Sequence, residues 1–208
     1  GRWTCEPCTR NASCLALPEA NGSCRQGTSS SKYAPNSPVT HPVSTHIPLS
    51  CANLTDREIN AATEAMRSET LSLGTWTIRF EDAVAQHVQS NYAVATSSPY
   101  TAMQLTLEAL HIGEGDEVIV PSFAFPTAAA CIIKLGATPI FADCDPRTMN
   151  MDAADVASKR SEKTKAIIAT HMFGNPTGID IIASIAQEQE IPLIEDAGQA
   201  IGSKLNNR

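Results

Sequence analysis

Short, largely apolar β-prone runs alternate with helical stretches from Tyr92 onward, and this alternation restricts the fold more than any other feature. The β-prone runs are Tyr92–Thr96, Glu117–Val120, Thr138–Ala142, Ala166–Thr170 and Pro192–Glu195. The helical stretches between them are Thr101–His111, Thr127–Leu135, Ala153–Lys159 and Ile179–Gln189. Such alternation implies right-handed crossovers, and runs that are apolar throughout indicate burial on both faces. We therefore predict an α/β fold, a mostly parallel sheet with helices on both faces.

The residues just before this alternation predict two further helices. Thr55 and Glu58 form a capping-box pattern, and apolar residues then recur at helical spacing. Leu71–Gly74 interrupts that helix, and Phe80–Val88 marks the second one. Two glycines stand where helices of the alternation should end in a left-handed C-cap: Gly113 and Gly136.

Residues 1–45 differ in composition from the rest of the chain. They are rich in Ser, Thr, Pro, Asn and Gly and have no helical or strand period, so we expect a flexible leader before a folded part at 46–208. Four of the seven cysteines lie here: Cys5, Cys8, Cys14 and Cys24. The first pair resembles half a zinc site, but the second pair lacks tight spacing and no histidine is near. Zinc and disulfides stay open as alternatives, and we favour an unstructured leader without metal.

The charge of the chain argues against nucleic acid and anionic lipid as partners. The net charge is −7, and residues 1–46 carry +2, so the remainder carries −9. Polyanion binding depends on clustered Lys and Arg, which an acidic body lacks. No apolar run reaches the length of about eighteen residues that a membrane span needs. No signal segment follows Gly1, so we expect a cytoplasmic protein.

Ligands of parallel α/β sheets bind at the carboxyl ends of the strands. The loops that follow the predicted strands are therefore the places to search: 97–101, 121–126, 143–147, 171–178 and 196–199. In the first, the hydroxyls of Ser98 and Thr101 at a helix N-terminus suit a phosphate. The alternative, which we favour for this loop alone, is an ordinary N-cap with Ser98 as cap and Pro99 at the first helical position.

Two other loops carry candidate ligand contacts. Phe123 and Phe125 follow one strand, and one of the two rings could face a planar ligand while the other packs in the core. Packing of both rings is the alternative. Asp196 ends another apolar strand, where a carboxylate is costly without a partner such as a protonated pyridine. Its alternative role is to cap the following turn.

Taken together and in order, these segments resemble the DegT/DnrJ/EryC1/StrS aminotransferases. The resemblance covers the whole chain except the leader, and its motifs are Ile47–Ser50, Leu71–Gly74, Tyr92–Ser98, His111–Phe125, Leu135–Asp143, His171–Gly174 and Ile194–Ala200. It implies the large domain of an aspartate-aminotransferase-like, fold-type I enzyme that uses pyridoxal 5'-phosphate (PLP). Members transfer an amino group, usually from glutamate, to a keto sugar linked to a nucleotide, and they form homodimers.

The resemblance also implies roles for individual residues. Phe125 would stack on the cofactor ring, and Asp196 would pair with the pyridinium nitrogen and keep it protonated. Gln199 would bind the ring hydroxyl. The phosphate would lie at three residues of the first loop: Ser98, Tyr100 and Thr101.

The chain departs from the family pattern at two places. Pro99-Tyr100 stands where the family has Gly-Thr, and proline has no N–H to give a phosphate. The lysine that forms the Schiff base would lie beyond Arg208, because neither Lys134 nor Lys204 matches its place. We therefore expect a truncated portion of the large domain that is inactive as it stands.

Three further interpretations accompany this one. The family includes dehydratases with histidine in place of the lysine, and a non-catalytic homologue that binds a nucleotide sugar is also open. Asn175–Gly178 spells a motif that binds the cofactor in other aminotransferases. Here it falls in a variable region of the family, so we predict a turn.

Overall fold

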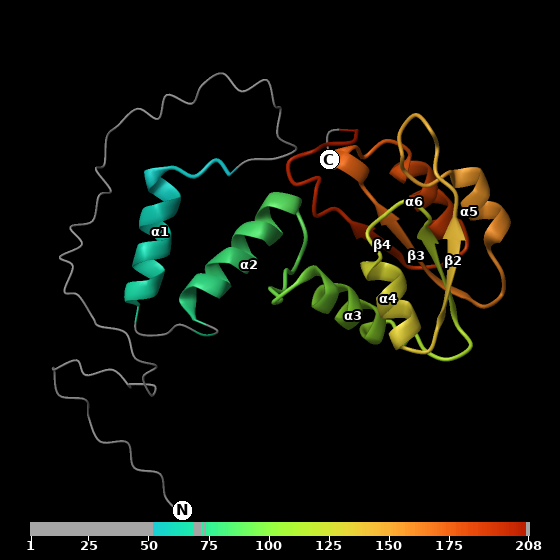
Figure 1. Cartoon of the computed structure of the whole chain (residues 1–208), viewed down its shortest axis with the longest axis horizontal. Helices are drawn as coiled ribbons and strands as arrows, with labels where there is room; N and C mark the ends of the chain where they lie inside the picture. The colour runs from blue at the N-terminus through green and yellow to red at the C-terminus, as the bar shows by residue number, and fades with distance from the viewer. Residues whose placement is uncertain (1–51, 69–71, 73, 207–208) are drawn as a thin grey trace, which may run out of the picture. The chain divides into compact units, whose positions relative to one another are not determined.

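The structure is a computed structural model that describes residues 52–68, 72 and 74–206 (Figure 1). The predicted leader, its four cysteines and the Ile47–Ser50 motif lie outside the described residues. The chain divides into two units, Gly1–Leu54 and Thr55–Arg208, and all described helices and strands belong to the second. None of these helices is long and apolar enough to cross a membrane.

Four parallel strands form the sheet, which confirms the predicted α/β class. They are β1 (Glu117–Pro121), β2 (Thr138–Ala142), β3 (Thr164–Thr170) and β4 (Leu193–Asp196), in the order β2-β1-β3-β4. The two central strands, β1 and β3, are buried along nearly their whole length, as their apolar sequences predicted. The outer strands β2 and β4 are only partly buried, because each has a neighbour on one side alone.

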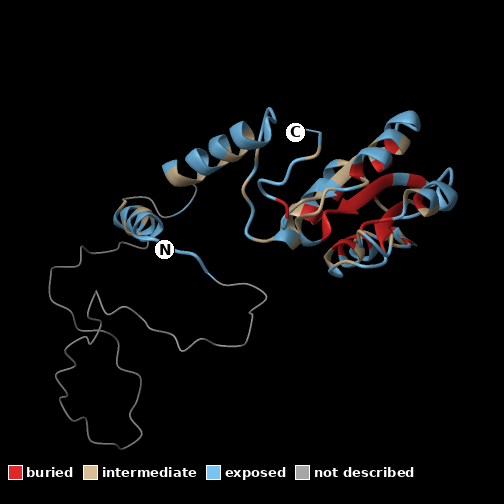
Figure 2. Ribbon diagram, turned by 90° about the horizontal axis from the view of Figure 1, so that it is seen from above, coloured by how far each residue is buried: buried red, intermediate tan, exposed pale blue. Residues whose placement is uncertain are grey.

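Helices cover both faces of this sheet, and two separate cores result (Figure 2). On one face, α3 (Pro99–Ala109) and α4 (Thr127–Lys134) pack on Val118, Val120 and Ile168. On the other, α5 (Ala153–Lys159) and α6 (Ile179–Glu188) pack on Ile119 and Ile167. Side chains that alternate along β1 and β3 therefore fill different cores.

Two helices precede the sheet, α1 (Asp56–Arg67) and α2 (Thr75–Val88). The predicted capping box is present at α1, where Glu58 accepts the Thr55 N–H at 2.7 Å. The Thr55 hydroxyl also donates to the Glu58 carboxylate. The hydrogen bond from the hydroxyl, followed by the one from the Thr55 N–H, holds the pKa of Glu58 below its ordinary value. Neither helix contains a buried residue among those described.

The predicted strand Tyr92–Thr96 is not a strand in the structure. Its backbone has no ladder partner; instead, the Ala95 N–H donates to Glu81 Oε1 at 2.7 Å, and Val94 is 79% exposed. The segment borders a hollow of about 460 Å³ that lies along β4 and α3, with apolar lining from Val94, Leu105, Ala109, Leu110, Leu193 and Ile194. A β-prone sequence becomes a strand only when a neighbouring strand accepts its hydrogen bonds, and no such neighbour is described here.

One predicted helix end is also wrong. The left-handed residue after α3 is His111, with φ +56°, and not Gly113. It follows the C-cap Leu110, and the Ile112 N–H then bonds back to the Leu107 carbonyl at 3.1 Å. Gly136, with φ +82°, is left-handed after α4 as predicted.

Polar side chains of α5 hold the carboxyl end of the edge strand β2. Asp155 Oδ2 accepts the Asp143 N–H at 2.6 Å and pairs with Lys159 at 2.7 Å, and Lys159 also donates to the Phe141 carbonyl at 2.8 Å. The Asp143 N–H, followed by Lys159, holds the pKa of Asp155 below its ordinary value. The contribution of this carboxylate to stability is therefore present above its unfolded pKa and is lost as the pH falls through the lower, folded pKa.

We expect Asp155→Asn to lower the urea midpoint at about pH 6 and to make the loss of stability toward about pH 3 shallower than in the wild type. Chemical unfolding at several pH values measures both effects. Glu188→Gln, at an exposed carboxylate of α6, is the control and should preserve the wild-type pH dependence. An unchanged acid limb in the Asp155 variant would contradict this assignment.

Candidate functional site at the carboxyl edge of the sheet

The loops that carry the predicted site residues meet at one edge and one face of the sheet. Ile194 of β4 packs on the α3/α4 core, so Asp196, two residues later, faces the same side. The Phe125 loop leads into α4, and Ser98 begins α3 on that face. Because β1 and β4 both pair with β3, their axes lie about 10 Å apart. This spacing suits one small planar molecule between the two loops.

Asp196 offers a carboxylate that makes no hydrogen bond or ion pair with the described residues. The residue is partly buried, and its main-chain carbonyl accepts the His171 N–H at 3.0 Å. No described residue donates a hydrogen bond to its carboxylate or pairs with it, so the alternative role as a turn cap is absent. A half-buried carboxylate without a partner favours a cationic ligand.

Gln199 has one half of its amide engaged and the other half available. Its Oε1 accepts the Phe173 N–H at 3.2 Å, which leaves the Nε2 group as a hydrogen-bond donor. The side chain is exposed in the loop just after β4. A donor held at this place suits a ligand oxygen that carries negative charge.

Both phenylalanines after β1 lie outside the two cores. Phe125 is 71% exposed and Phe123 is 43% exposed, so packing of both rings is not their arrangement. Phe123 instead lies against Phe173, with ring centroids 6.4 Å apart and planes tilted by 53°. Phe125 makes no ring contact with a described residue and is the ring left for a planar ligand.

If PLP binds at this edge, as the family resemblance implies, Phe125→Ala should weaken its binding about three- to tenfold, because an aromatic stacking partner contributes about 0.5–1.5 kcal/mol beyond its buried area. Fluorescence titration of the cofactor with the full chain measures the dissociation constant. Phe80→Ala removes a ring of similar exposure from α2 and serves as the control. Equal effects of the two substitutions would argue against a stacking role.

The N-terminus of α3 combines an N-cap with a small group of hydroxyls. Ser98 Oγ accepts the Thr101 N–H at 3.1 Å, and Pro99 occupies the first helical turn, so the predicted N-cap is present. The Ser98 and Ser97 hydroxyls lie 3.0 and 3.4 Å from Thr101 Oγ1. The cap uses the Thr101 N–H and Pro99 has none, which leaves the Tyr100 N–H as the free donor of this turn.

The side chain of Tyr100 turns away from this group of hydroxyls. Its ring packs against the α3/α4 core, and the Lys134 ammonium lies 5.5 Å from the ring centroid. Lys134 also donates to Gln104 Oε1 at 3.1 Å. Tyr100 can therefore contribute its main-chain N–H to a phosphate, while its phenol belongs to the packing of α3 on α4.

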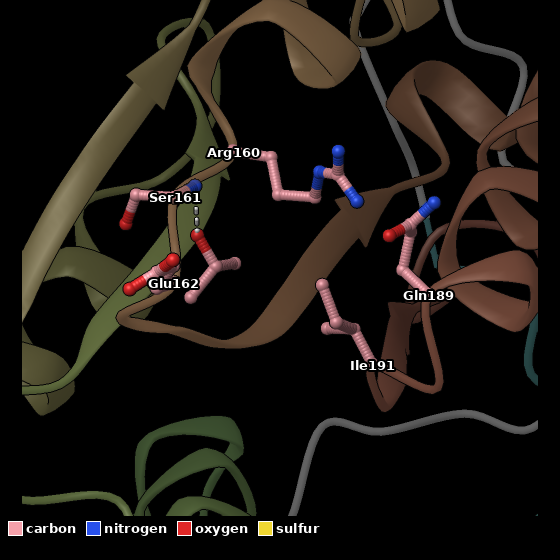
Figure 3. A pocket seen from close by; sticks show the side chains of 6 residues that line it. Arg160, Ser161, Glu162, Gln189 and Ile191 are labelled. Carbon is pink, nitrogen blue, oxygen red and sulfur yellow. Dashed lines mark hydrogen bonds between the residues drawn. The ribbon is translucent and has the colours of Figure 1, made fainter.

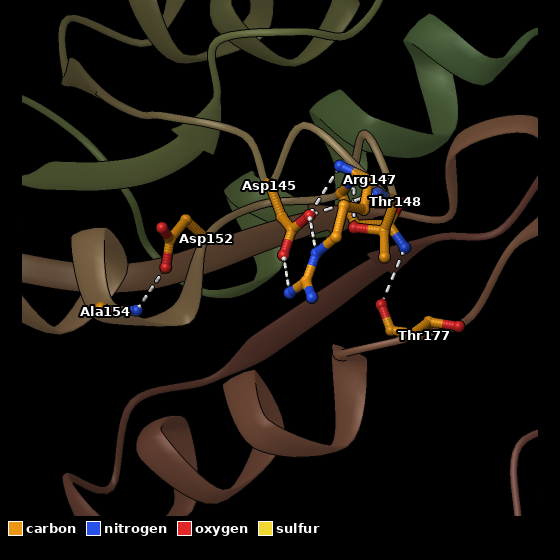
Figure 4. A network of polar contacts seen from close by, with 7 residues as sticks. Asp145, Arg147, Thr148, Asp152, Ala154 and Thr177 are labelled. Carbon is orange, nitrogen blue, oxygen red and sulfur yellow. Dashed lines mark hydrogen bonds and ion pairs between the residues drawn. The ribbon is translucent and has the colours of Figure 1, made fainter.

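Asn175–Gly178 forms the predicted turn. Asn175 Oδ1 accepts both the N–H and the hydroxyl of Thr177, at 3.1 and 2.7 Å, which is an Asx turn. Figure 4 shows Thr177 next to the β2–α5 loop, where Asp145 holds Arg147. The hydrogen bonds from Arg147 lower the pKa of Asp145, and the Asp145 carboxylate raises that of Arg147. These two loops are thus ordered by polar contacts of their own.

A second hollow, of about 450 Å³, lies at the opposite edge of the sheet. Arg160, Gln189 and Ile191 border it at the amino ends of β3 and β4, as Figure 3 shows. It contains none of the predicted site residues, and its position is the edge where parallel α/β sheets seldom bind ligands. Among the described residues, no group of three or more His, Cys, Asp or Glu side chains could hold a metal ion.

Comparison with known proteins shows the family of the chain. The family model described as the DegT/DnrJ/EryC1/StrS aminotransferase family matches residues 52–208. The chain belongs to this family. The match includes every helix and strand of the structure, and it confirms the resemblance that the ordered motifs predicted.

Several proteins of known sequence are similar to this chain. GDP-perosamine synthase of Escherichia coli O157:H7 is 36% identical over 164 residues, which are 78% of this chain and 45% of that protein. A pleiotropic regulatory protein of Geobacillus stearothermophilus is 39% identical over 145 residues, 70% of this chain and 39% of that protein. The chain thus spans less than half the length of these relatives.

Similar solved structures confirm the fold-type I assignment. A GDP-4-keto-6-deoxymannose-3-dehydratase with a trapped PLP-glutamate geminal diamine has a TM-score of 0.73 at 30% identity, and the match covers 78% of this chain and 44% of that one. A 3-amino-5-hydroxybenzoic acid synthase has a TM-score of 0.71 at 30% identity, covering 75% and 41%. The sheet of this chain and its covering helices therefore have the fold-type I architecture.

The residues of this family member fit PLP at the carboxyl edge. The free Asp196 carboxylate suits the pyridinium nitrogen, and the Gln199 Nε2 suits the ring oxygen. The hydroxyls of Ser97, Ser98 and Thr101 suit the phosphate. Because proline has no N–H, Pro99 gives this phosphate-binding site one N–H donor fewer than a glycine at that position would.

Sequence reasoning assigned no role to two residues that shape this edge. His171 is 7% exposed, and its Nε2 lies 2.8 Å from Glu195 Oε2, while Nδ1 has no hydrogen-bond partner in the part of the chain that the structure describes. Phe173 has a left-handed backbone, with φ +55°. The available signal was a polar and an aromatic residue just before Gly174 at the end of a buried strand, a pattern that marks a ligand-side loop.

Proposed function

We propose that residues 46–208 form the cofactor-binding part of a PLP-dependent aminotransferase that transfers an amino group, from glutamate, to a keto nucleotide-sugar. Three observations support this: membership of the family, the similarity to GDP-perosamine synthase, and the convergence of the predicted site residues at one edge. We propose further that the enzyme is a cytoplasmic homodimer, by analogy with the family.

The observation that carries the proposal is the free carboxylate of Asp196. It ends β4 on the face that α3 and α4 cover, partly buried, and no residue that the structure describes pairs with it. Bound PLP supplies a protonated ring that accepts electrons from the reacting carbon. Asp196 holds the proton on the ring nitrogen, because an anion next to the pyridinium favours its charged form.

Each remaining residue of the site has a binding role. Phe125 presents its ring to the face of the heterocycle, and Gln199 donates Nε2–H to the ring oxygen. Ser98 and Thr101 bind the phosphate by their hydroxyls, and Tyr100 binds it by its main-chain N–H. The positive end of the α3 dipole adds to this attraction for the phosphate.

Calorimetric titration of the 208-residue chain tests the proposal directly. PLP and pyridoxamine phosphate should bind with one site per chain, and pyridoxal, which lacks the phosphate, should bind more weakly. GDP-4-keto-6-deoxymannose should bind more tightly once the pyridoxamine form is present. Nucleotide-sugar binding without any affinity for PLP would contradict the proposal and would support a non-catalytic sugar-binding protein.

A dehydratase of the same family is the second candidate, because a sugar dehydratase fits this chain with a TM-score of 0.73. The two reactions differ in their products. Because the residue that forms the Schiff base is expected beyond Arg208, this test uses a longer chain that includes that position. Incubation of that chain with the keto sugar, glutamate labelled with ¹⁵N and PLP should give a sugar that carries the label if the protein is an aminotransferase. A sugar that has lost a hydroxyl without gaining ¹⁵N would identify a dehydratase.

A further inference from the structure

The most completely bonded buried polar side chain of the described residues belongs to Asn150, in the loop between β2 and α5. It is 1% exposed, and its amide crosses to the loop between β3 and α6. Oδ1 accepts the Met172 N–H at 2.9 Å, and Nδ2 donates to the carbonyls of Asn175 and Thr177 at 2.8 and 2.9 Å. Three of the four hydrogen bonds that an amide side chain can make thus go to a single turn.

Main-chain hydrogen bonds also hold the loop around Asn150, so the position of its side-chain amide is defined. The Asp145 N–H donates to the Asn150 carbonyl at 2.8 Å, and the Asn150 N–H donates to Thr148 Oγ1 at 3.3 Å. An isolated antiparallel β-bridge between the main chains of Cys144 and Met151 closes the base of the loop. Figure 4 shows how closely this loop and the turn at Thr177 approach each other.

The turn that Asn150 holds contains a main-chain contact to the proposed cofactor site. Met172 and Asn175, which bond to Asn150, flank Phe173, whose backbone is left-handed. The Phe173 N–H donates to Gln199 Oε1 at 3.2 Å. A left-handed phenylalanine costs free energy unless the surrounding contacts fix it, and the bonds to Asn150 do so on both sides.

We infer that Asn150 is a positioning residue that sets the orientation of the Gln199 side-chain amide. By fixing the Phe173 N–H, it holds Gln199 Oε1 toward the turn and therefore turns Nε2 toward the ligand side. Asn150 itself touches no ligand. A merely structural role would instead weaken the binding of every ligand to the same extent.

This inference rests on the proposed function, and the test separates the two. PLP and 3-deoxypyridoxal phosphate, which lacks the ring hydroxyl, are titrated into the full chain, and the ratio of their dissociation constants reports the Gln199 hydrogen bond. The wild type should prefer PLP about three- to tenfold. Absence of PLP binding in the wild type would overturn the proposed function and, with it, the inference.

Asn150→Ala should bring this preference close to one, as Gln199→Ala should, and the double variant should show no further change. Asn150→Asp is the substitute if the alanine variant does not fold. It keeps the shape of the side chain and the acceptor for the Met172 N–H but loses both donors, so it should also reduce the preference for PLP. Leu105→Ala, on the exposed side of α3, is the control and should keep the wild-type preference. A wild-type preference in a folded Asn150 variant would overturn the inference while it leaves the proposed function intact.

Discussion

Asp196→Asn should weaken the binding of PLP to the 208-residue chain by about 10- to 100-fold, because a hydrogen bond to a charged group contributes about 1.5–3 kcal/mol. Asparagine has nearly the shape of aspartate but carries no charge to keep the pyridine nitrogen protonated. Since no described residue bonds to the Asp196 carboxylate, its substitution should leave the unfolding midpoint nearly unchanged. Fluorescence titration and thermal unfolding of the same samples measure the two effects.

The ring nitrogen itself provides the sharpest control for this substitution. A deaza analogue of PLP, with carbon in place of that nitrogen, should bind the wild type and Asp196→Asn with similar affinity. Glu162→Gln removes a carboxylate at the opposite edge of the sheet and should bind PLP as the wild type does. If Asp196→Asn weakened both PLP and the deaza analogue equally, the carboxylate would act on something other than the nitrogen.

Gly174→Ala should both destabilise the fold and weaken PLP binding. A Cβ at position 174 would lie 2.8 Å from the Gln199 carbonyl oxygen, a main-chain atom that cannot move without the whole loop. The backbone there has φ +80°, which alone costs an alanine about 1–2 kcal/mol. We expect a loss of about 2 kcal/mol or more in the free energy of unfolding, and a displaced Gln199 loop.

Gly178→Ala separates strain from displacement. Its φ is +87°, but an added Cβ would meet nothing within 4 Å. The backbone strain at Gly178→Ala should therefore lower the free energy of unfolding by about 1–2 kcal/mol, as φ alone does at position 174. The affinity for PLP should stay at the wild-type value. Equal losses of PLP affinity in the two variants would show that the close contact between Gly174 and Gln199 is unimportant for the site.

The elements that sequence predicted best are those whose signal is local. The strand Thr138–Ala142 and the helix Ala153–Lys159 have the predicted bounds, because each is a short periodic run between clear breaks. The N-cap at Ser98 followed from its neighbour Pro99. Tyr92–Thr96 was wrong because strand formation depends on a distant partner, which composition does not reveal.

The parts of the site that sequence missed depend on contacts between distant segments. Asn150 bonds to residues 22, 25 and 27 positions later, and none of these contacts follows from its neighbours. The ring of Tyr100 lies near the Lys134 ammonium, although the position of Tyr100 in the chain suggested a contact with the phosphate. The order of Phe125, Asp196 and Gln199 along the chain was informative because parallel strands bring their carboxyl ends to one edge.

A crystal structure of the full chain soaked with PLP tests the central claim most directly. We expect the pyridine nitrogen within about 2.7–2.9 Å of an Asp196 carboxylate oxygen, with the Phe125 ring against one face of the heterocycle. PLP bound elsewhere, such as in the hollow bordered by Arg160 and Gln189, or bound with its ring nitrogen toward solvent, would contradict the account.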